Sequence, residues 1–304
     1  MQNSFFETAS LEPIGQGRNN QVYLAMTVKG ERYILKHYYR DISDKRDRLG
    51  TEFSALEFLW NNGVRTIPKP IKANKELGMA LYEYIDGVFL EKTSQKDLDA
   101  AIQLIQNLKK LSTSQEAKNF YNASEACFSA KAIVQVINNR LGRLIEALEL
   151  KEFLEKDFIP AFQTIKRGDE KETESKRKTL SPSDFGFHNA RKRLNGEIVF
   201  LDFEYFGWDD PAKMICDFLL HPGMNLGQSL KQYFFKKAIG CFPEDHSLAD
   251  RIRKWYPLLG LNWCLIFLNE FLPGKTEGKF RKEEQLAKAN QKLKTITQNG
   301  FNLA

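Results

Sequence analysis

The pattern of apolar residues changes near residue 87, and this change constrains the fold more than any other feature of the chain. Before it, two runs rich in β-branched and aromatic residues, Gln21–Val28 and Arg32–Tyr38, flank the turn signal Lys29-Gly30 and predict a hairpin. After it, long segments with helical periodicity predominate. The sequence therefore predicts an α+β protein with a small antiparallel sheet at residues 1–86 and a larger, mostly helical part at residues 87–304.

The remaining elements follow the same two patterns. In the first part we expect a helix at Lys45–Asn62 with Leu49, Phe53 and Leu56 on one face, and a strand at Leu77–Ile85 that Asp86-Gly87 ends. In the second part we expect helices at Lys96–Leu111, Ala123–Leu150 and Glu152–Ile165, a charged loop at Lys166–Lys178, and short strands at Leu180–Pro182 and Glu197–Phe203.

Composition excludes several classes of protein. The 304 residues include 45 basic and 39 acidic side chains, a mild excess of +6, and no basic-plus-aromatic RNA motif accompanies it, so we expect no nucleic-acid partner. Four scattered cysteines favour a reducing compartment over a zinc site or a disulfide framework. The most apolar window, Leu258–Leu272, is too short and polar to span a bilayer, and the N-terminus lacks a signal-peptide pattern. We therefore expect a cytoplasmic protein with no membrane segment and no obligate protein partner.

A glycine-containing loop lies between two strand-like segments near the N-terminus. Gly15 and Gly17 allow the backbone to approach a ligand closely, so that N–H groups of the loop up to Asn20 could contact phosphate oxygens. The loop lacks the third glycine of a dinucleotide site and the Gly-Lys-Ser/Thr ending of a P-loop. Taken alone, an ordinary hairpin turn explains the two glycines equally well.

Two charged residues occur on elements that are otherwise apolar. Lys36 lies on the returning strand of the hairpin, and Glu52 on the following helix is its natural partner. Each residue by itself is more often a surface residue than a functional one.

Oxygen-bearing side chains gather in two later segments. Asp184 and Asn189 belong to Ser183-Asp-Phe-Gly-Phe-His-Asn189, and Asp202 follows an apolar strand. Two carboxylates and an amide suit Mg²⁺, whereas only His188 would offer nitrogen to a transition metal. The alternative is that each aspartate only caps a turn.

The order of these motifs along the chain decides between the functional and the purely structural interpretations. A glycine loop, a strand lysine, a helix glutamate, a linker strand, Asp-x4-Asn and an aspartate after a strand also make up the signature set of protein kinases, in the same order. It is improbable that all of these motifs occur in this order by chance, so the pattern predicts an ATP-dependent phosphotransferase.

The chain resembles the aminoglycoside phosphotransferase and choline kinase family over nearly its whole length. Pro182–Asn189 and Leu201-Asp-Phe-Glu204 match the second halves of that family's His-Gly-Asp-x4-Asn loop and Ile-Asp-Phe-Glu strand, and no Ala-Pro-Glu motif of protein kinases follows. The resemblance implies a protein-kinase-like fold of two lobes, the cofactors ATP and Mg²⁺, and a hydroxyl group of a small molecule as acceptor.

The resemblance also implies a role for individual residues. Asp184 would accept or orient the proton of the acceptor hydroxyl, Asn189 and Asp202 would hold Mg²⁺, and Lys36 would contact the nucleotide phosphates while paired with Glu52. The further roles implied are adenine binding by the backbone of Glu83 and Ile85, and bracing of the catalytic loop by Asp217.

Two departures from the family pattern leave an alternative open. Pro182 stands where the family has histidine and Ser183 where it has glycine. That histidine mainly supports loop geometry, so its loss fits either an active kinase or a nucleotide-binding pseudoenzyme. A third class, a binder of nucleic acid or of another anionic surface, rests on the net charge alone.

The acceptor is the least constrained part of the prediction. Glu204, Asp209 and Trp208, together with Asp210 and Tyr205, form an acidic and aromatic group near the metal strand. Such a group favours a cationic or polyhydroxyl acceptor, through cation–π contact with an amino alcohol such as choline or through hydrogen bonds to a sugar or amino sugar. Aromatic residues of this kind are more often packing residues than a ligand cage.

Overall fold

The computed structural model describes residue 6 and residues 8–16, 20–38, 46–166, 172–272 and 281–302. The chain divides into two compact units, each made of two segments: Met1–Ser124 with Pro182–Gly207, and Glu125–Ser181 with Trp208–Ala304. The predicted boundary at residue 86 divides the chain into two continuous lobes, whereas each of these units consists of two segments. That boundary therefore stays a prediction. Gly17 and Lys45 lie outside the described residues.

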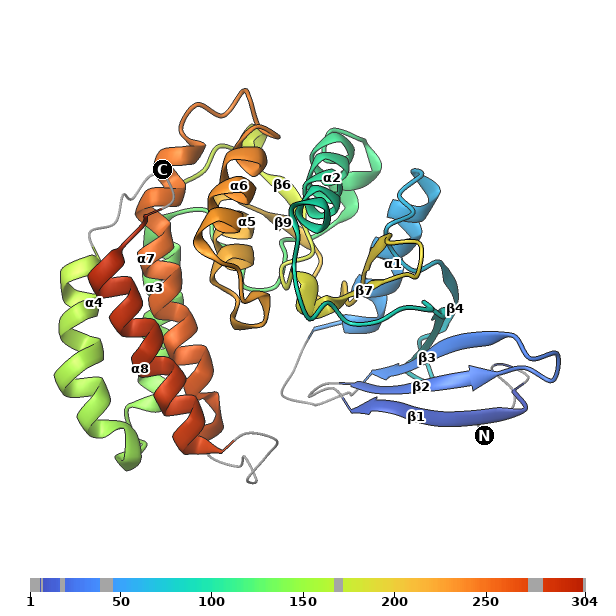
Figure 1. Ribbon diagram of the computed structural model, residues 1–304, viewed down its shortest axis with the longest axis horizontal. Coiled ribbons are helices and arrows are strands. Elements are labelled where there is room, and N and C mark those ends of the chain that lie inside the picture. The colour runs from blue at the N-terminus through green and yellow to red at the C-terminus, as the bar shows by residue number, and fades with distance from the viewer. Residues whose placement is uncertain are drawn as a thin grey trace. The chain divides into compact units, whose positions relative to one another are not determined.

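The first unit is built on an antiparallel sheet of five described strands in the order β1-β2-β3-β5-β4. Its strands are β1 (Ser10–Gln16), β2 (Asn20–Met26), β3 (Arg32–Tyr38), β4 (Pro70–Asn74) and β5 (Met79–Glu83). Figure 1 shows β1, β2 and β3 lying side by side. The β2–β3 hairpin confirms the strands predicted there, and one face of the sheet is closed by the buried side chains of Ala25, Leu35, Met79 and Leu81.

Helix α1 (Arg48–Asn61) buries two charged residues, Arg48 and Glu52. The carboxylate of Asp47 caps its first turn by accepting a hydrogen bond from the Gly50 amide at 2.9 Å. Leu49, Leu56 and Leu59 are buried on the same side as Glu52, and the helix packs against β4 and β5. The predicted helix is therefore confirmed, and its packing orients Glu52 toward the interior of the unit.

The rest of the first unit consists of one helix, a small strand pair and short turns. Helix α2 (Gln95–Leu111) begins with a capping box of Ser94 and Asp97, which confirms the predicted start within one residue. Strands β7 (Ala190–Lys192) and β8 (Ile198–Phe200) pair antiparallel. Two 3-10 turns are formed by Glu116–Asn119 and Phe187–Asn189.

The second unit is mostly helical, which agrees with the predicted α+β fold class. Its helices are α3 (Ala130–Leu144), α4 (Ile159–Ile165) after a π-helix (Phe153–Phe158), α5 (Pro211–Leu220), α6 (Gln228–Ile239), α7 (Leu248–Phe267) and α8 (Lys282–Asn299). Its short elements are the pair of β6 (Thr179–Ser181) with β9 (Gly207–Asp209) and 3-10 turns at Leu148–Leu150, Ser175–Arg177, Pro222–Met224 and Leu268–Phe271. Helix α7 lies at the centre and packs against α3, α5 and α8, as Figure 1 shows.

One predicted helix is too long. The expected helix at Ala123–Leu150 is shortened to α3, because the side chain of Ser129 caps a helix start by accepting from the Ala132 amide at 3.1 Å, and Glu125 has a left-handed φ of 59°. In the described part of the chain no helix is both long and apolar enough to cross a membrane.

Gly87, where the predicted linker ends, has no room for a side chain, and this leads to a stability prediction. A Cβ atom at Gly87 would lie 2.6 Å from the Lys192 carbonyl oxygen, beside the bridge between Val88 and Lys192. We expect Gly87→Ala to lower the free energy of unfolding by about 1–3 kcal/mol, the usual cost of overpacking. Urea unfolding followed by circular dichroism measures it.

A matched control comes from a glycine with free space around it. A Cβ atom at Gly142, inside α3, would meet nothing within 4 Å. Gly142→Ala should therefore raise the free energy of unfolding by about 0.5–1 kcal/mol through helix propensity. Equal stability of Gly87→Ala and the wild type would contradict the close contact.

Candidate active site

The amine of Lys36 lies at the centre of a buried cluster of charges in the first unit. Its Nζ is 2.6 Å from Oε2 of Glu52 and 2.6 Å from Oδ1 of Asp202, and 4.0 Å from Oε2 of Glu204. The three carboxylates come from α1 and from the segment after β8, and Lys36 comes from β3. The structure thus brings together a strand lysine, a helix glutamate and a loop aspartate that are far apart in the sequence.

This cluster keeps the lysine charged. Lys36 is only 8% exposed. Burial alone would lower its pKa, but the three surrounding carboxylates outweigh burial and raise the pKa of Lys36 above its usual range. Glu52 is fixed in turn, because it accepts further hydrogen bonds from the hydroxyl of Tyr38 at 2.6 Å and from the backbone amide of Phe203 at 3.3 Å. A permanently charged, held amine suits contact with phosphate oxygens.

Asp202 is the exposed member of the cluster. Its side chain is 37% exposed, compared with 4% for Glu52, so it remains partly accessible to solvent. Its backbone has a left-handed φ of 66°, a conformation that costs energy in a residue other than glycine. The contact with Nζ of Lys36 at 2.6 Å holds this carboxylate in the cluster.

The loop between β6 and β7 carries Asp184 and Asn189. The Asn189 side chain donates through Nδ2 to the carbonyl oxygen of Asp184 at 3.1 Å, which leaves Oδ1 as the amide atom that can bind a cation. The backbone amide of Leu201 donates to the Asn189 carbonyl at 2.7 Å. Pairing of Ala190 with Phe200 continues this register, so Asn189 lies beside the residue that precedes Asp202.

These residues fit a magnesium site through the chemistry of their donor atoms. The carboxylate of Asp202 and the free amide oxygen of Asn189 are hard oxygen ligands of the kind Mg²⁺ prefers. The carboxylate oxygens of Asp202, Glu52 and Glu204 lie within 4.8 Å of one another. The carboxylate of Asp184 is hydrogen bonded elsewhere, to His188, at 2.9 Å from its Nε2 atom.

Glu204 is buried rather than presented to solvent. It is 3% exposed and accepts hydrogen bonds from Nδ2 of Asn20 at 2.6 Å and from Nη1 of Arg48 at 2.8 Å. Burial alone would raise its pKa, but the charge of Lys36 and the Asn20 hydrogen bond outweigh burial and lower the pKa of Glu204. The carboxylate therefore ties the end of the glycine-containing loop to the start of α1.

Asn20 has a second polar atom that is still available. Its Oδ1 is buried and makes no hydrogen bond among the residues that the structure describes. A buried acceptor without a partner is costly, so a ligand donor near the glycine-containing loop would be favoured there. Gly15 lies in β1 and is exposed beside its partner Val22.

The end of β5 places the two residues predicted to bind adenine. The Glu83 amide donates to the Lys69 carbonyl at 2.9 Å, and the Glu83 carboxylate pairs with Arg193 at 2.7 Å. Ile85 is 3% exposed and follows two residues later. The Glu83 side chain is thus engaged, so any contact of this segment with a ligand has to come from backbone groups.

The other acidic residues considered for the acceptor belong to buried ion pairs of the second unit. Asp209 has 0% exposure, lies 3.5 Å from Nζ of Lys213, and accepts from the backbone amide of Asp210; burial raises its pKa to about 7. Asp210 caps α5 and pairs with Arg251 at 3.0 Å. Trp208, in β9, is half-buried.

Asp217 lies in the same unit. Its carboxylate is 2.7 Å from Nζ of Lys213 and accepts from Nε1 of Trp263 at 3.2 Å. The predicted bracing of the catalytic loop by Asp217 stays a prediction.

Sequence reasoning missed Arg48 and the part played by His188. Arg48 opens a helix and looks like an ordinary first-turn residue, and no local pattern shows that it pairs with a glutamate 156 positions away. His188 stands in the motif itself, four residues after Asp184, and this spacing was the available signal.

A charged lysine–glutamate pair between a strand and a helix, with an aspartate beside it after a strand, is also the arrangement found in protein kinases. The chain belongs to the Phosphotransferase enzyme family, whose sequence profile matches residues 10–224. No curated protein matches the chain significantly.

Solved structures agree with this assignment at the level of the fold. A choline kinase of Streptococcus pneumoniae is similar with a TM-score of 0.65 and 19% identity, over 96% of this chain and 96% of that one. An aminoglycoside phosphotransferase in complex with gentamicin has a TM-score of 0.65 and 16% identity, over 96% and 93%. An ethanolamine kinase of Plasmodium vivax has a TM-score of 0.59 and 16% identity, over 96% and 84%. The predicted family and kinase-like α+β fold are confirmed.

Proposed function

We propose that this protein transfers the γ-phosphoryl group of Mg-ATP to a hydroxyl group of a small molecule. The observation that carries the proposal is the position of Lys36, which is 2.6 Å from both Glu52 and Asp202. One carboxylate is buried and fixes the lysine, and the other is half-exposed and remains accessible to a metal. Phosphoryl transfer needs mainly positioning and stabilisation of charge, and this arrangement offers both.

Each candidate residue then has a role in binding or in the reaction. Lys36 contacts phosphate oxygens, and Asn189 and Asp202 hold Mg²⁺, which neutralises part of the phosphate charge when bound. Asp184 orients the acceptor hydroxyl and takes its proton. Two further groups position the nucleotide: backbone atoms of Glu83 and Ile85 hold the adenine, and Gly15, Gly17 and Asn20 of the glycine-containing loop contact the phosphates.

The proposed acceptor is an amino alcohol, a sugar or an aminoglycoside-like molecule. The similar solved structures include kinases named for choline and ethanolamine and an aminoglycoside phosphotransferase with gentamicin, and all of these are hydroxyl-bearing, cationic small molecules. Because the identities are below 20%, the choice among these acceptors rests on experiment.

The hydrogen bonds of the segment before Asp184 favour catalysis over simple nucleotide binding. Ser183 stands at a left-handed φ of 68°, and its hydroxyl donates to the Ser124 carbonyl at 2.9 Å. Pro182 is buried, and its carbonyl accepts from the Asp184 amide at 3.0 Å. These bonds hold the backbone beside Asp184, although Pro182 and Ser183 stand in place of the usual histidine and glycine.

Two measurements test the proposal together. Thermal unfolding is followed with ATP alone, Mg²⁺ alone and Mg-ATP, and we expect the largest stabilisation with Mg-ATP, about 2.7 kcal/mol at 100 times the dissociation constant. ADP release is then measured with choline, ethanolamine, hexoses and aminoglycosides as acceptors. A protein that Mg-ATP does not stabilise is not a kinase, and one that binds Mg-ATP but phosphorylates no acceptor in a wide panel is a binding protein.

A further inference from the structure

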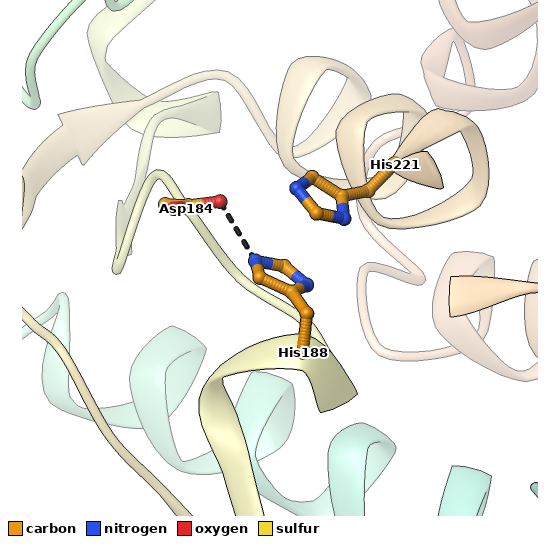
Figure 2. A group of neighbouring side chains, drawn as sticks. All are labelled: Asp184, His188 and His221. Atoms are coloured by element: carbon orange, nitrogen blue, oxygen red, sulfur yellow. Dashed lines mark hydrogen bonds and ion pairs between the residues drawn. The ribbon is translucent and has the colours of Figure 1, made fainter. Parts of the chain in front are cut away.

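Asp184, the proposed proton acceptor, has a histidine as its side-chain partner. Nε2 of His188 lies 2.9 Å from Oδ1 of Asp184, and Figure 2 shows this contact as a dashed line between the two side chains. The Asp184 side chain is 38% exposed and that of His188 16% exposed. The histidine is therefore more enclosed than the carboxylate that it contacts.

The alternation of residues in the loop explains why the two side chains meet. Phe185 and Phe187 are each 3% exposed, and their rings lie 5.3 and 6.1 Å from the ring of Phe200 on β8. Because these two phenylalanines anchor one side of the loop in the core, Asp184 and His188 project from the other. His188 lies in the 3-10 turn Phe187–Asn189, four residues after Asp184, and Figure 2 shows the two side chains pointing toward one another.

The chemistry of the pair determines which atom carries the proton. An ionised carboxylate has no proton to donate, so Nε2 of His188 must be the donor of this hydrogen bond. The bond engages Oδ1 of Asp184, so the histidine limits the orientation that the carboxylate can take. The backbone of Asp184 is held separately, since Asn189 donates to its carbonyl at 3.1 Å. Carbonyl and carboxylate are thus fixed by neighbouring residues.

We propose that His188 is a positioning residue for Asp184: its Nε2–H holds the carboxylate in the orientation in which it takes the proton of the acceptor hydroxyl. The inference rests on the proposed function. It gives the loop, which has Pro182 in place of the family's histidine, a histidine that acts on the carboxylate from the opposite end of the motif.

Two variants distinguish the effect of the His188 hydrogen-bond donor from the effect of its ring. His188→Phe keeps a flat ring without a donor, whereas the amide of His188→Gln can place a nitrogen donor near the position of Nε2. We expect His188→Phe to lower kcat about tenfold, within the range for loss of a residue that orients a catalytic or metal-binding group, with KM for ATP and for the acceptor unchanged. His188→Gln should restore kcat to within about threefold of the wild type.

The assays use the full chain, Mg-ATP and the best acceptor of the panel. The matched control is His246→Phe, an exposed histidine between α6 and α7, which should leave kcat unchanged. Circular dichroism and the Mg-ATP thermal shift establish that each variant is folded and binds nucleotide. Wild-type kcat in His188→Phe, or a His188→Gln variant as slow as His188→Phe, would overturn the positioning role.

A spectroscopic readout tests the pair without any turnover. Nitrogen NMR of labelled imidazole at about pH 8, where an ordinary histidine is neutral, should show His188 as the Nε2–H tautomer, and Asp184→Ala should reduce the share of that tautomer. A wild-type ring protonated on Nδ1 overturns the inference. Because this measurement needs no acceptor, it also distinguishes the two failures: absent turnover with the Nε2–H tautomer present counts against the proposed function alone.

Discussion

Asp184→Asn is expected to reduce turnover by at least about a hundredfold, within the usual range for loss of a general base, while Mg-ATP binding persists. The amide has nearly the shape of the carboxylate but cannot take a proton. Asn189 bonds the backbone carbonyl of residue 184 rather than its side chain, and the Oδ1 atom of an asparagine can still accept from His188. The variant therefore removes the chemistry and keeps the loop.

The measurement compares kcat with the thermal shift produced by Mg-ATP. A matched control is Asp157→Asn, an exposed aspartate in the π-helix of the second unit, which should leave both quantities unchanged. If Asp184→Asn turned over acceptor within a fewfold of the wild type, Asp184 would not be the base. Loss of both turnover and Mg-ATP binding would instead indicate that the substitution had disturbed the loop.

The parts of the fold that could be predicted are those with a local pattern. The hairpin of β2 and β3 has alternating side chains and a glycine turn, and α2 has a capping box, so both appear where the sequence placed them. Strand β4 was missed, because it begins with Pro70, has only five residues and lies at the edge of the sheet. Edge strands carry weak patterns, since one side of the strand makes no sheet contacts.

The motif residues of the candidate site could be predicted from their order in the sequence, but the hydrogen bonds and ion pairs that connect them to distant residues could not. The ion pair of Lys36 with Glu52 follows from one strand and the next helix, and the structure forms it at 2.6 Å. The burial of Glu204 depends on Asn20 and Arg48, which are 184 and 156 positions away. Contacts over such separations are set by how the elements pack, so local periodicity carried no sign of them.

Sequence motifs identified Ser183 and Asp202, but they did not predict the backbone conformation of either residue. Both adopt a left-handed backbone, with φ of 68° and 66°, although neither is a glycine. The sequence offered one sign of this at Ser183, because the family has glycine at that position. Strained residues of this kind concentrate where a side chain or loop has to be held in one direction, which agrees with the proposed roles of the two loops.

Asp202→Asn is expected to lower turnover by about 10²–10³-fold and to weaken the Mg²⁺ dependence of nucleotide binding. Asparagine tolerates the left-handed backbone that residue 202 adopts, so the loop should keep its shape. Lys36 would keep Glu52 as a charged partner, but the half-exposed negative charge proposed to bind Mg²⁺ would be gone. The measurement is a Mg²⁺ titration of the thermal shift produced by ADP, with an arm lacking metal.

Glu204→Gln is the matched comparison, because it removes a second carboxylate charge near the same lysine, 4.0 Å from its Nζ. Since Glu204 is buried against Arg48, this variant should lose about 1–3 kcal/mol of unfolding free energy and keep its response to Mg²⁺. Asp202→Asn should do the reverse, with nearly wild-type stability and a Mg²⁺ titration shifted to higher concentration. Equal Mg²⁺ titrations for Asp202→Asn and the wild type would show that the half-exposed carboxylate is a partner of Lys36 only, because a true ligand cannot lose its charge without a change in metal affinity.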